Sequence, residues 1–140
     1  MNPILLKGNC HTDDRGNLKY NNDFDASEVK RTYIIENKST VFKRGWQGHK
    51  VEQRWFSALS GSFQIQLIKV DDWEHPSTTL NPFVFQLESK TLDVLHIPAG
   101  YISCIQATEE NSKLLVMADY LLGQISDEFR YALDQFNCTK

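Results

Sequence analysis

The chain has 140 residues and a formal net charge of -3 at pH 7, a length that suits a single domain, 1–140, with its own hydrophobic core. Its net negative charge excludes the dense cationic surface that nonspecific nucleic-acid binding requires, and its apolar runs are shorter than the roughly 20 residues that span a bilayer. The first nine residues, MNPILLKGN, carry too few apolar residues for a secretory signal. The three cysteines form no CxxC pair, so we expect a cytoplasmic protein with reduced thiols.

Short segments with alternating apolar and polar residues predict β-strands through most of the chain. The segment 29–36 places Arg31, Tyr33 and Ile35 on one face, and the segment 55–60 places Phe56 opposite Trp55. Similar alternation continues over 63–67, 83–87 and 92–96. The run 114–118 is apolar throughout, which is typical of a strand buried on both faces. Glycine- and proline-containing turns separate these segments.

One helix is predicted, at about 126–137, after the last strand. Ser126 can cap it, and the acidic pair that follows favours a first helical turn. Three apolar residues at helical spacing form a stripe: Phe129, Leu133 and Phe136. Many short strands with one terminal helix predict an all-β jelly roll or barrel over about 10–125.

Two segments carry the polar residues that bear most on function. The first reads RGWQGHK at 44–50 and the second reads LHIPAGYIS at 95–103. Together they resemble the paired signature of cupins, and in the metal-binding cupins two histidines, a glutamate and a third histidine bind the metal. The corresponding residues here are Gln47, His49, Arg54 and Ser103. Of these four positions only His49 keeps a metal ligand, and the permanently cationic Arg54 would repel a divalent metal. We therefore expect no metal and no other cofactor.

Further motifs narrow the resemblance: DRG at 14–16, KRTY at 30–33, LSGS at 59–62, IPAG at 97–100 and ADY at 118–120. With the RG pair at 44–45, they resemble the thymidine-diphosphate 4-keto-6-deoxyhexose 3,4-ketoisomerases (WxcM-like) and, more distantly, the RmlC-like 3,5-epimerases. The resemblance covers about 10–125. It implies a double-stranded β-helix, a homodimer that often exchanges N-terminal strands, and a nucleotide sugar bound inside the barrel. The chain departs from the ketoisomerases at Gln47 and Ser103, where they have histidines.

The ketoisomerase reaction needs a base for the C3 proton and a donor for the enediolate oxygen. His49 is the expected base, because a histidine titrates near working pH, and Tyr33 is the expected donor. Arg31 and Arg44 suit a diphosphate, and Trp46 or Trp55 could stack on the base or sugar. The full set of expected substrate-binding residues is Arg31, Arg44, Gln47, Lys50, Trp55, Tyr101 and Ser103.

These assignments have structural alternatives. His49 could serve only as a hydrogen-bonding residue of the barrel, and Arg31 and Tyr33 could form a structural network. Trp55 is more often a core residue than a stacking one. The sequence leaves open whether His96 faces the cavity or the outside of the sheet.

Three functions follow from this reading. The first is a metal-free nucleotide-sugar isomerase, a 3,4-ketoisomerase or epimerase of deoxysugar and polysaccharide biosynthesis, and Arg31, Tyr33, Arg44 and His49 favour it. The second is a catalytically impaired cupin that binds a nucleotide sugar or related anion, which Gln47 and Ser103 favour. The third, a metal-dependent oxygenase, has too few ligands. Fold by itself does not choose among them.

Overall fold

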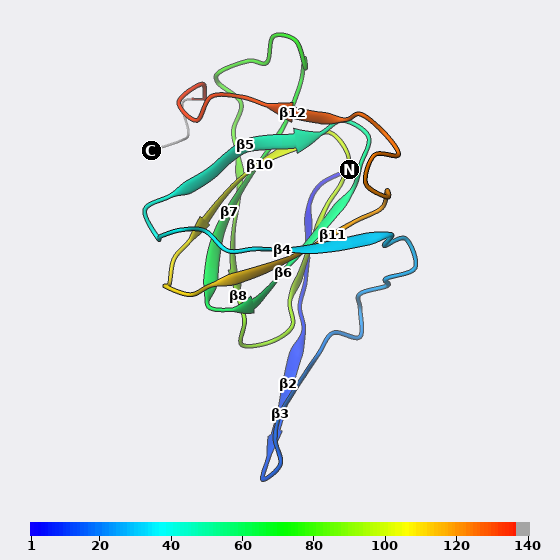
Figure 1. Cartoon of the computed structure of the whole chain (residues 1–140), viewed down its shortest axis with the longest axis vertical. Coiled ribbons are helices and arrows are strands. Elements are labelled where there is room, and N and C mark those ends of the chain that lie inside the picture. The colour runs from blue at the N-terminus through cyan, green and yellow to red at the C-terminus, as the bar shows by residue number, and fades with distance from the viewer. Residues whose placement is uncertain (137–140) are drawn as a thin grey trace.

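The structure, a computed structural model, describes residues 1–136, which form twelve strands and no helix (Figure 1). The strands are β1 (Ile4–Leu6), β2 (Asn9–Asp13), β3 (Gly16–Tyr20), β4 (Arg31–Ile35), β5 (Lys43–His49), β6 (Arg54–Ser60), β7 (Ser62–Lys69), β8 (Phe83–Glu88), β9 (Val94–Ile97), β10 (Tyr101–Ala107), β11 (Lys113–Ala118) and β12 (Glu128–Arg130). Within this part of the chain no helix is long and apolar enough to cross a membrane.

Two five-stranded antiparallel sheets form the walls of a jelly roll. One has the order β1-β9-β6-β11-β4 and the other β12-β5-β10-β7-β8. Strands distant in sequence lie side by side, since β10 pairs with both β5 and β7. The prediction of an all-β jelly roll is confirmed.

The core lies between the two sheets, as the alternation predicts. On β7, Phe63, Ile65 and Leu67 are fully buried in it, and on β6 Phe56 points inward with Ala58. Burying one such large side chain contributes about 1.5–3 kcal/mol. The apolar run of β11 is also buried on both faces, with Val116 in the core and Met117 in a separate outer cluster.

The strands of the barrel extend beyond the predicted limits of 10–125. β1 pairs with β9, with Ile4 opposite His96, and β12 pairs with β5. The β2–β3 hairpin forms a two-stranded sheet of its own. Figure 1 shows this hairpin projecting away from the barrel.

The predicted C-terminal helix at 126–137 is wrong over the described residues, while residue 137 lies outside them. The chain instead forms β12, which pairs with β5 so that Phe129 lies opposite Gly48. This pairing satisfies backbone groups along the edge of β5 that a helix would leave without partners.

The apolar residues of the predicted helical stripe contact different parts of the barrel. The Phe129 ring lies 4.6 Å from that of Trp73, and the Phe136 ring packs edge-on at 5.6 Å from that of Trp46. Leu133 is 36% exposed. A short strand followed by turns reaches these separate contacts, whereas one helical face would not.

Candidate active site

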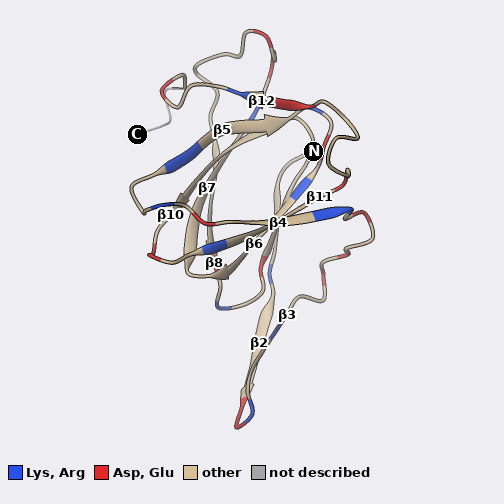
Figure 2. Ribbon diagram, viewed as in Figure 1, with Lys and Arg blue, Asp and Glu red and all other residues tan. Residues whose placement is uncertain are grey.

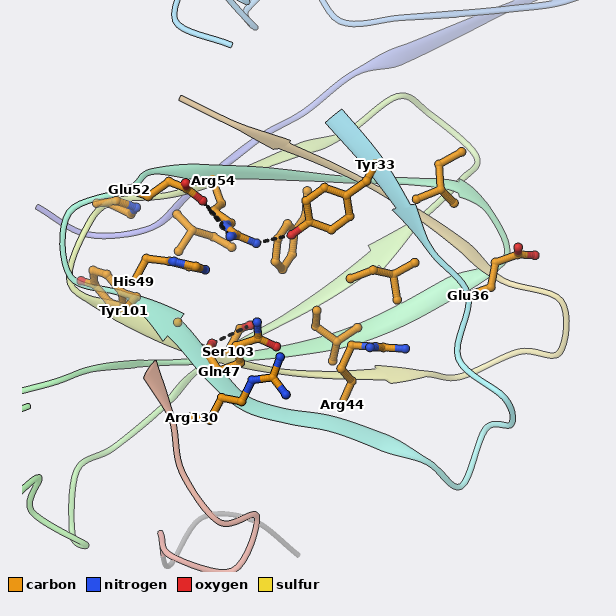
Figure 3. Close-up of a pocket in the computed structure, with 17 residues that line it drawn as sticks. Tyr33, Glu36, Arg44, Gln47, His49, Glu52, Arg54, Tyr101, Ser103 and Arg130 are labelled. Carbon is orange, nitrogen blue, oxygen red and sulfur yellow. Dashed lines mark hydrogen bonds and ion pairs between the residues drawn. The ribbon is translucent and has the colours of Figure 1, made fainter. Parts of the chain in front are cut away.

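A cavity of about 530 Å³ lies between the two sheets (Figure 3). Its apolar floor includes Ile35, Phe56 and Ile105, and polar groups line the rest. The polar lining residues are Tyr33, Glu36, Arg44, Gln47, His49, Glu52, Arg54, Tyr101, Ser103 and Arg130. A mostly preformed cavity with a few convergent polar groups is the usual form of a small-molecule site.

His49 ends β5 and turns its imidazole into this cavity (Figure 3). The residue before it must be glycine, because a Cβ on Gly48 would lie 2.1 Å from the carbonyl oxygen of Tyr101 on the neighbouring strand. This close approach of β5 to β10 positions the imidazole, and His49 is only 9% exposed.

The protonation state of His49 follows from its contacts. Its Nδ1 lies 3.1 Å from the backbone carbonyl oxygen of Asp127, and because a carbonyl only accepts, Nδ1 carries the hydrogen. Nε2 is buried and has no hydrogen-bond partner among the described residues. Burial, and after it the positive charge of Arg54, lower the pKa of His49 to about 4 against the opposing effects of Asp127 and Glu128. At neutral pH, Nε2 therefore presents a free lone pair.

Asp127 holds this arrangement from outside the cavity. Its carboxylate accepts hydrogen bonds from the backbone N–H groups of Lys50, Val51 and Glu52, at 2.8–3.0 Å. The same residue accepts the His49 hydrogen through its main-chain carbonyl. Asp127 thus orders both the turn after β5 and the imidazole.

A charged network faces His49 across the cavity. Arg54 donates to Glu52 through Nε at 2.9 Å and Nη2 at 2.7 Å, and Nη1 donates to the Tyr33 hydroxyl. Arg31 reaches the same Glu52 oxygen at 3.6 Å, and its guanidinium carbon lies 5.2 Å from the centre of the Tyr33 ring. Because two guanidinium groups share one carboxylate, the network has a surplus positive charge.

Gln47 and Ser103 lie opposite each other on β5 and β10. The Gln47 amide donates to the carboxylate of Glu128 on β12, and the Ser103 hydroxyl donates to the Gln47 carbonyl at 3.4 Å. Both residues line the cavity, and their role in substrate binding stays a prediction. Neither an amide nor an ordinary hydroxyl is a base of histidine's strength.

Two basic residues lie along the β5 side of the cavity. Figure 3 shows Arg130, from β12, beside Gln47, and Arg44, from β5, farther from His49. Figure 2 shows the basic start of β5, formed by Lys43 and Arg44, and the mixed charges of β12. Arg44 also donates to the Asn37 side chain at 3.2 Å. Guanidinium groups at an opening suit an anionic group such as a diphosphate.

The structure brings His49, Tyr33, Arg44, Gln47, Tyr101 and Ser103 to the cavity. The Tyr101 hydroxyl is already engaged, since it donates to the Met1 carbonyl at 2.8 Å. Arg31 lines a smaller adjoining cavity of about 170 Å³, which shares His49, Glu52 and Arg54 with the main one. Arg31 therefore lies beside the main cavity, next to Glu52, and does not line it.

Trp55 and Lys50 are not brought to the cavity. Trp55 alternates with inward-facing Phe56, so it points to the outer face of its sheet and stacks on His96, with ring centres 5.3 Å apart. This stacking also places His96 on the outside. Lys50 is exposed in the turn after β5, and Trp46 is buried in a cluster outside the barrel core.

Arg54, Glu52 and Arg130 are site residues that the sequence reading did not assign. The sequence did hold a sign of Arg54, because a cation stands where the metal-binding cupin pattern has a carboxylate. It held no sign of Arg130, since that segment was predicted to be a helix. Its position opposite Gln47 arises only from the pairing of β12 with β5.

The residues at the cupin metal positions do not fit a metal ion. An amide, one imidazole, a guanidinium and a hydroxyl occupy them, and the Arg54 guanidinium would repel a divalent cation. Within residues 1–136, no group of three or more His, Cys, Asp or Glu side chains could hold a metal ion.

The fold and the site define the chain as a cupin jelly roll with a basic cavity and one inward-facing histidine. The family model described as WxcM-like, C-terminal (FdtA) matches residues 2–136, and the chain therefore belongs to this family. No curated protein matches the chain.

Solved structures share the fold at low sequence identity. A histidine-to-asparagine mutant of the QdtA 3,4-ketoisomerase from Thermoanaerobacterium thermosaccharolyticum, in complex with TDP-4-keto-6-deoxyglucose, is 23% identical with a TM-score of 0.71, over 93% of this chain and 88% of that one. The WlaRB TDP-quinovose 3,4-ketoisomerase from Campylobacter jejuni is 24% identical with a TM-score of 0.70, over 93% of each chain. The rmlC epimerase from Mycobacterium tuberculosis is 11% identical with a TM-score of 0.70, over 91% of this chain and 68% of that one. The predicted resemblance to sugar-nucleotide isomerase and epimerase cupins is confirmed.

Proposed function

We propose that the chain is a sugar-nucleotide isomerase that moves the ketone of a TDP-4-keto-6-deoxyhexose from C4 to C3, in deoxysugar biosynthesis for surface polysaccharide. One observation carries this proposal. The buried Nε2 of His49 is without a partner among the described residues and lines the cavity, while the Tyr33 hydroxyl lines the same cavity. A base and a donor around one substrate-sized space are the groups that an enediol mechanism needs.

The proposed steps transfer protons only. His49 Nε2 removes the C3 proton, the C3–H electrons form a C3=C4 double bond, and O4 takes the proton of the Tyr33 hydroxyl. The resulting enediol collapses when C4 takes the proton from the His49 imidazolium and O3 returns its proton to the Tyr33 oxygen. A C3 ketone and a C4 hydroxyl result, and both side chains recover their starting states.

The low pKa of His49 suits this role in one respect and opposes it in another. At a pKa of about 4 the imidazole is neutral at pH 7 and free to accept a proton, but it is a weaker base than an ordinary histidine. A bound diphosphate brings negative charge, which raises the pKa of a nearby histidine. We propose that binding of the diphosphate at Arg44 and Arg130 raises the pKa of His49 as the substrate enters.

Incubation with TDP-4-keto-6-deoxyglucose in deuterated water tests the function. We expect the wild-type protein to place deuterium on C3 or C4 and to form the 3-keto isomer, as measured by NMR and mass spectrometry. Because no step uses a metal, EDTA should leave the rate unchanged. A protein that binds TDP but exchanges no proton in any keto-sugar tested contradicts the proposal.

That contrary outcome would favour a second candidate, a cupin that binds nucleotide sugars without turnover. The observation in its favour is the state of Gln47 and Ser103. Their side chains are engaged with Glu128 and with the β5 backbone, so these positions provide no second base to assist His49.

We also propose a homodimer. The β2–β3 hairpin projects from the barrel (Figure 1), and β4 is an unpaired edge of its sheet with Ile34 53% exposed. Exposed sheet edges are usually covered. In a symmetric pair of chains, each chain would cover the β4 edge and the hairpin of the other. Light scattering at micromolar concentration should give twice the chain mass, and a monomer would contradict the proposal.

A further inference from the structure

Arg54 is the most enclosed cation of the cavity. Its side chain is 12% exposed and that of its partner Glu52 is 6% exposed. A buried arginine usually needs a carboxylate partner, and Glu52 provides it through Nε and Nη2. Nη1 remains, and it is directed to the Tyr33 hydroxyl (Figure 3).

The direction of that hydrogen bond determines what Tyr33 can do. A guanidinium only donates, so the Tyr33 oxygen must accept. The phenol then keeps its own hydrogen for another acceptor, and the residue lines the cavity. Tyr33 is thus set as a donor toward a bound molecule, and Arg54 stands ready to stabilise the negative charge that the phenol oxygen acquires when it gives its proton away.

We infer that Arg54 is a positioning residue for the proposed reaction, one that directs the Tyr33 proton into the cavity and disfavours a positive charge on the His49 imidazole. The role of Arg54 in catalysis rests on the proposed function. Its electrostatic part concerns His49 in the free protein and is measurable without any substrate.

The charges around His49 show why Arg54 has this influence. The neighbouring groups come from β6, from the turn after β5, from the start of β12 and from β10, and they are Arg54, Glu52, Asp127, Glu128 and Tyr101. The acidic residues Asp127 and Glu128 raise the pKa of His49, whereas burial and Arg54 lower it. Without Arg54, the acidic neighbours would raise the pKa of His49, and burial would be the main effect left opposing them.

Arg54→Met and Arg54→Lys separate the two roles. Methionine removes the charge and the donor, so the pKa of His49, followed by NMR titration, should rise by about one unit or more. Lysine keeps a cation but lacks the planar fork that holds Glu52 and Tyr33 together. We expect Arg54→Lys to leave the His49 titration near that of wild type while kcat still falls. Arg15→Met, at the exposed hairpin turn, is the matched control and should change neither.

The catalytic part is tested by kinetics of ketone migration. Arg54→Met should lower kcat by about 100-fold, the usual effect of losing one preorganised donor, with KM nearly unchanged, and the acid limb of its pH profile should move upward. In a Tyr33→Phe background, removing Arg54 should cost much less, because the hydroxyl through which it acts is gone. If Arg54→Met does not fold, the Glu52→Gln/Arg54→Met double variant removes both charges together.

Two results would overturn the inference: an unchanged His49 titration in Arg54→Met, or losses in kcat that simply add to those of Tyr33→Phe. If the wild-type protein moves no ketone, the proposed function fails instead. The NMR titration then still decides whether Arg54 controls the charge of His49.

Discussion

Replacing His49 with asparagine is expected to suppress deuterium wash-in from solvent by about 100-fold or more, the usual scale for loss of a general base. Asparagine has a side-chain N–H that can still donate to the Asp127 carbonyl, so the cavity should keep its shape. Affinity for TDP, measured by calorimetry, should change little. Exchange at the wild-type rate would show that another group removes the C3 proton.

His96→Asn is the matched control for that experiment. His96 is a half-buried histidine whose pKa, like that of His49, is lowered mainly by burial, but it lies on the outer face of β9, stacked on Trp55. Its replacement should leave exchange unchanged. Equal losses in both variants would indicate general damage to the barrel instead of loss of a base.

The same His49 variant has an expected effect on stability that needs no substrate. The pKa of His49 is about 4 in the folded chain against an ordinary value of 6.5, so below pH 6.5 the unfolded chain binds the proton first. Above pH 6.5 the group has no effect, and between 6.5 and about 4 it removes roughly 3 kcal/mol of stability. His49→Asn should abolish this part of the acid sensitivity, as measured by urea unfolding at about pH 7.5 and about pH 4.5.

Asp127→Ala is expected to destabilise the fold by about 3 kcal/mol, because it leaves the N–H groups of three consecutive residues without their shared acceptor. The main-chain carbonyl that accepts the Nδ1 hydrogen of His49 remains in this variant, but it loses the side-chain anchor that holds it against the turn after β5, so the imidazole should no longer keep one fixed tautomer. Urea unfolding measures the first effect, and the ¹⁵N shifts of the imidazole measure the second.

Asp25→Ala provides the comparison for Asp127. Asp25 is exposed and accepts one backbone hydrogen bond, from Ser27 at 2.9 Å, so its removal should leave the free energy of unfolding nearly unchanged. If Asp127→Ala is as stable as this control and His49 keeps its tautomer, the ordering role of Asp127 is wrong.

Local alternation determines which side chains share a face of a strand, and the sequence alone predicts it. The opposition of Phe56 and Trp55 predicted one inward and one outward residue, and the structure confirms it. The signature strand likewise placed His49 at the cavity. The predicted substrate-stacking role of Trp55 does not fit its place on the outer face. That prediction rested on the stacking preference of tryptophan, and alternation says only that Trp55 and Phe56 face opposite ways, not which of them faces inward.

The C-terminal segment shows the limit of local patterns. Its apolar residues have helical spacing, and its acidic start would favour a helix. A strand forms instead because β5 has an open edge there and the Trp46 and Trp73 rings offer separate contacts. Neither is visible within the segment itself.

The chain's own sequence determined the all-β fold, the positions of most strands along the chain and the one histidine of the cavity, since these depend on period-two alternation and on residue type. Only the tertiary structure decided the chemistry of that histidine. Its tautomer and low pKa come from a carbonyl 78 positions away, from burial, and from the charge of Arg54. Electrostatic effects act through space and depend on which groups the fold brings together, so no local pattern in the chain could have specified them.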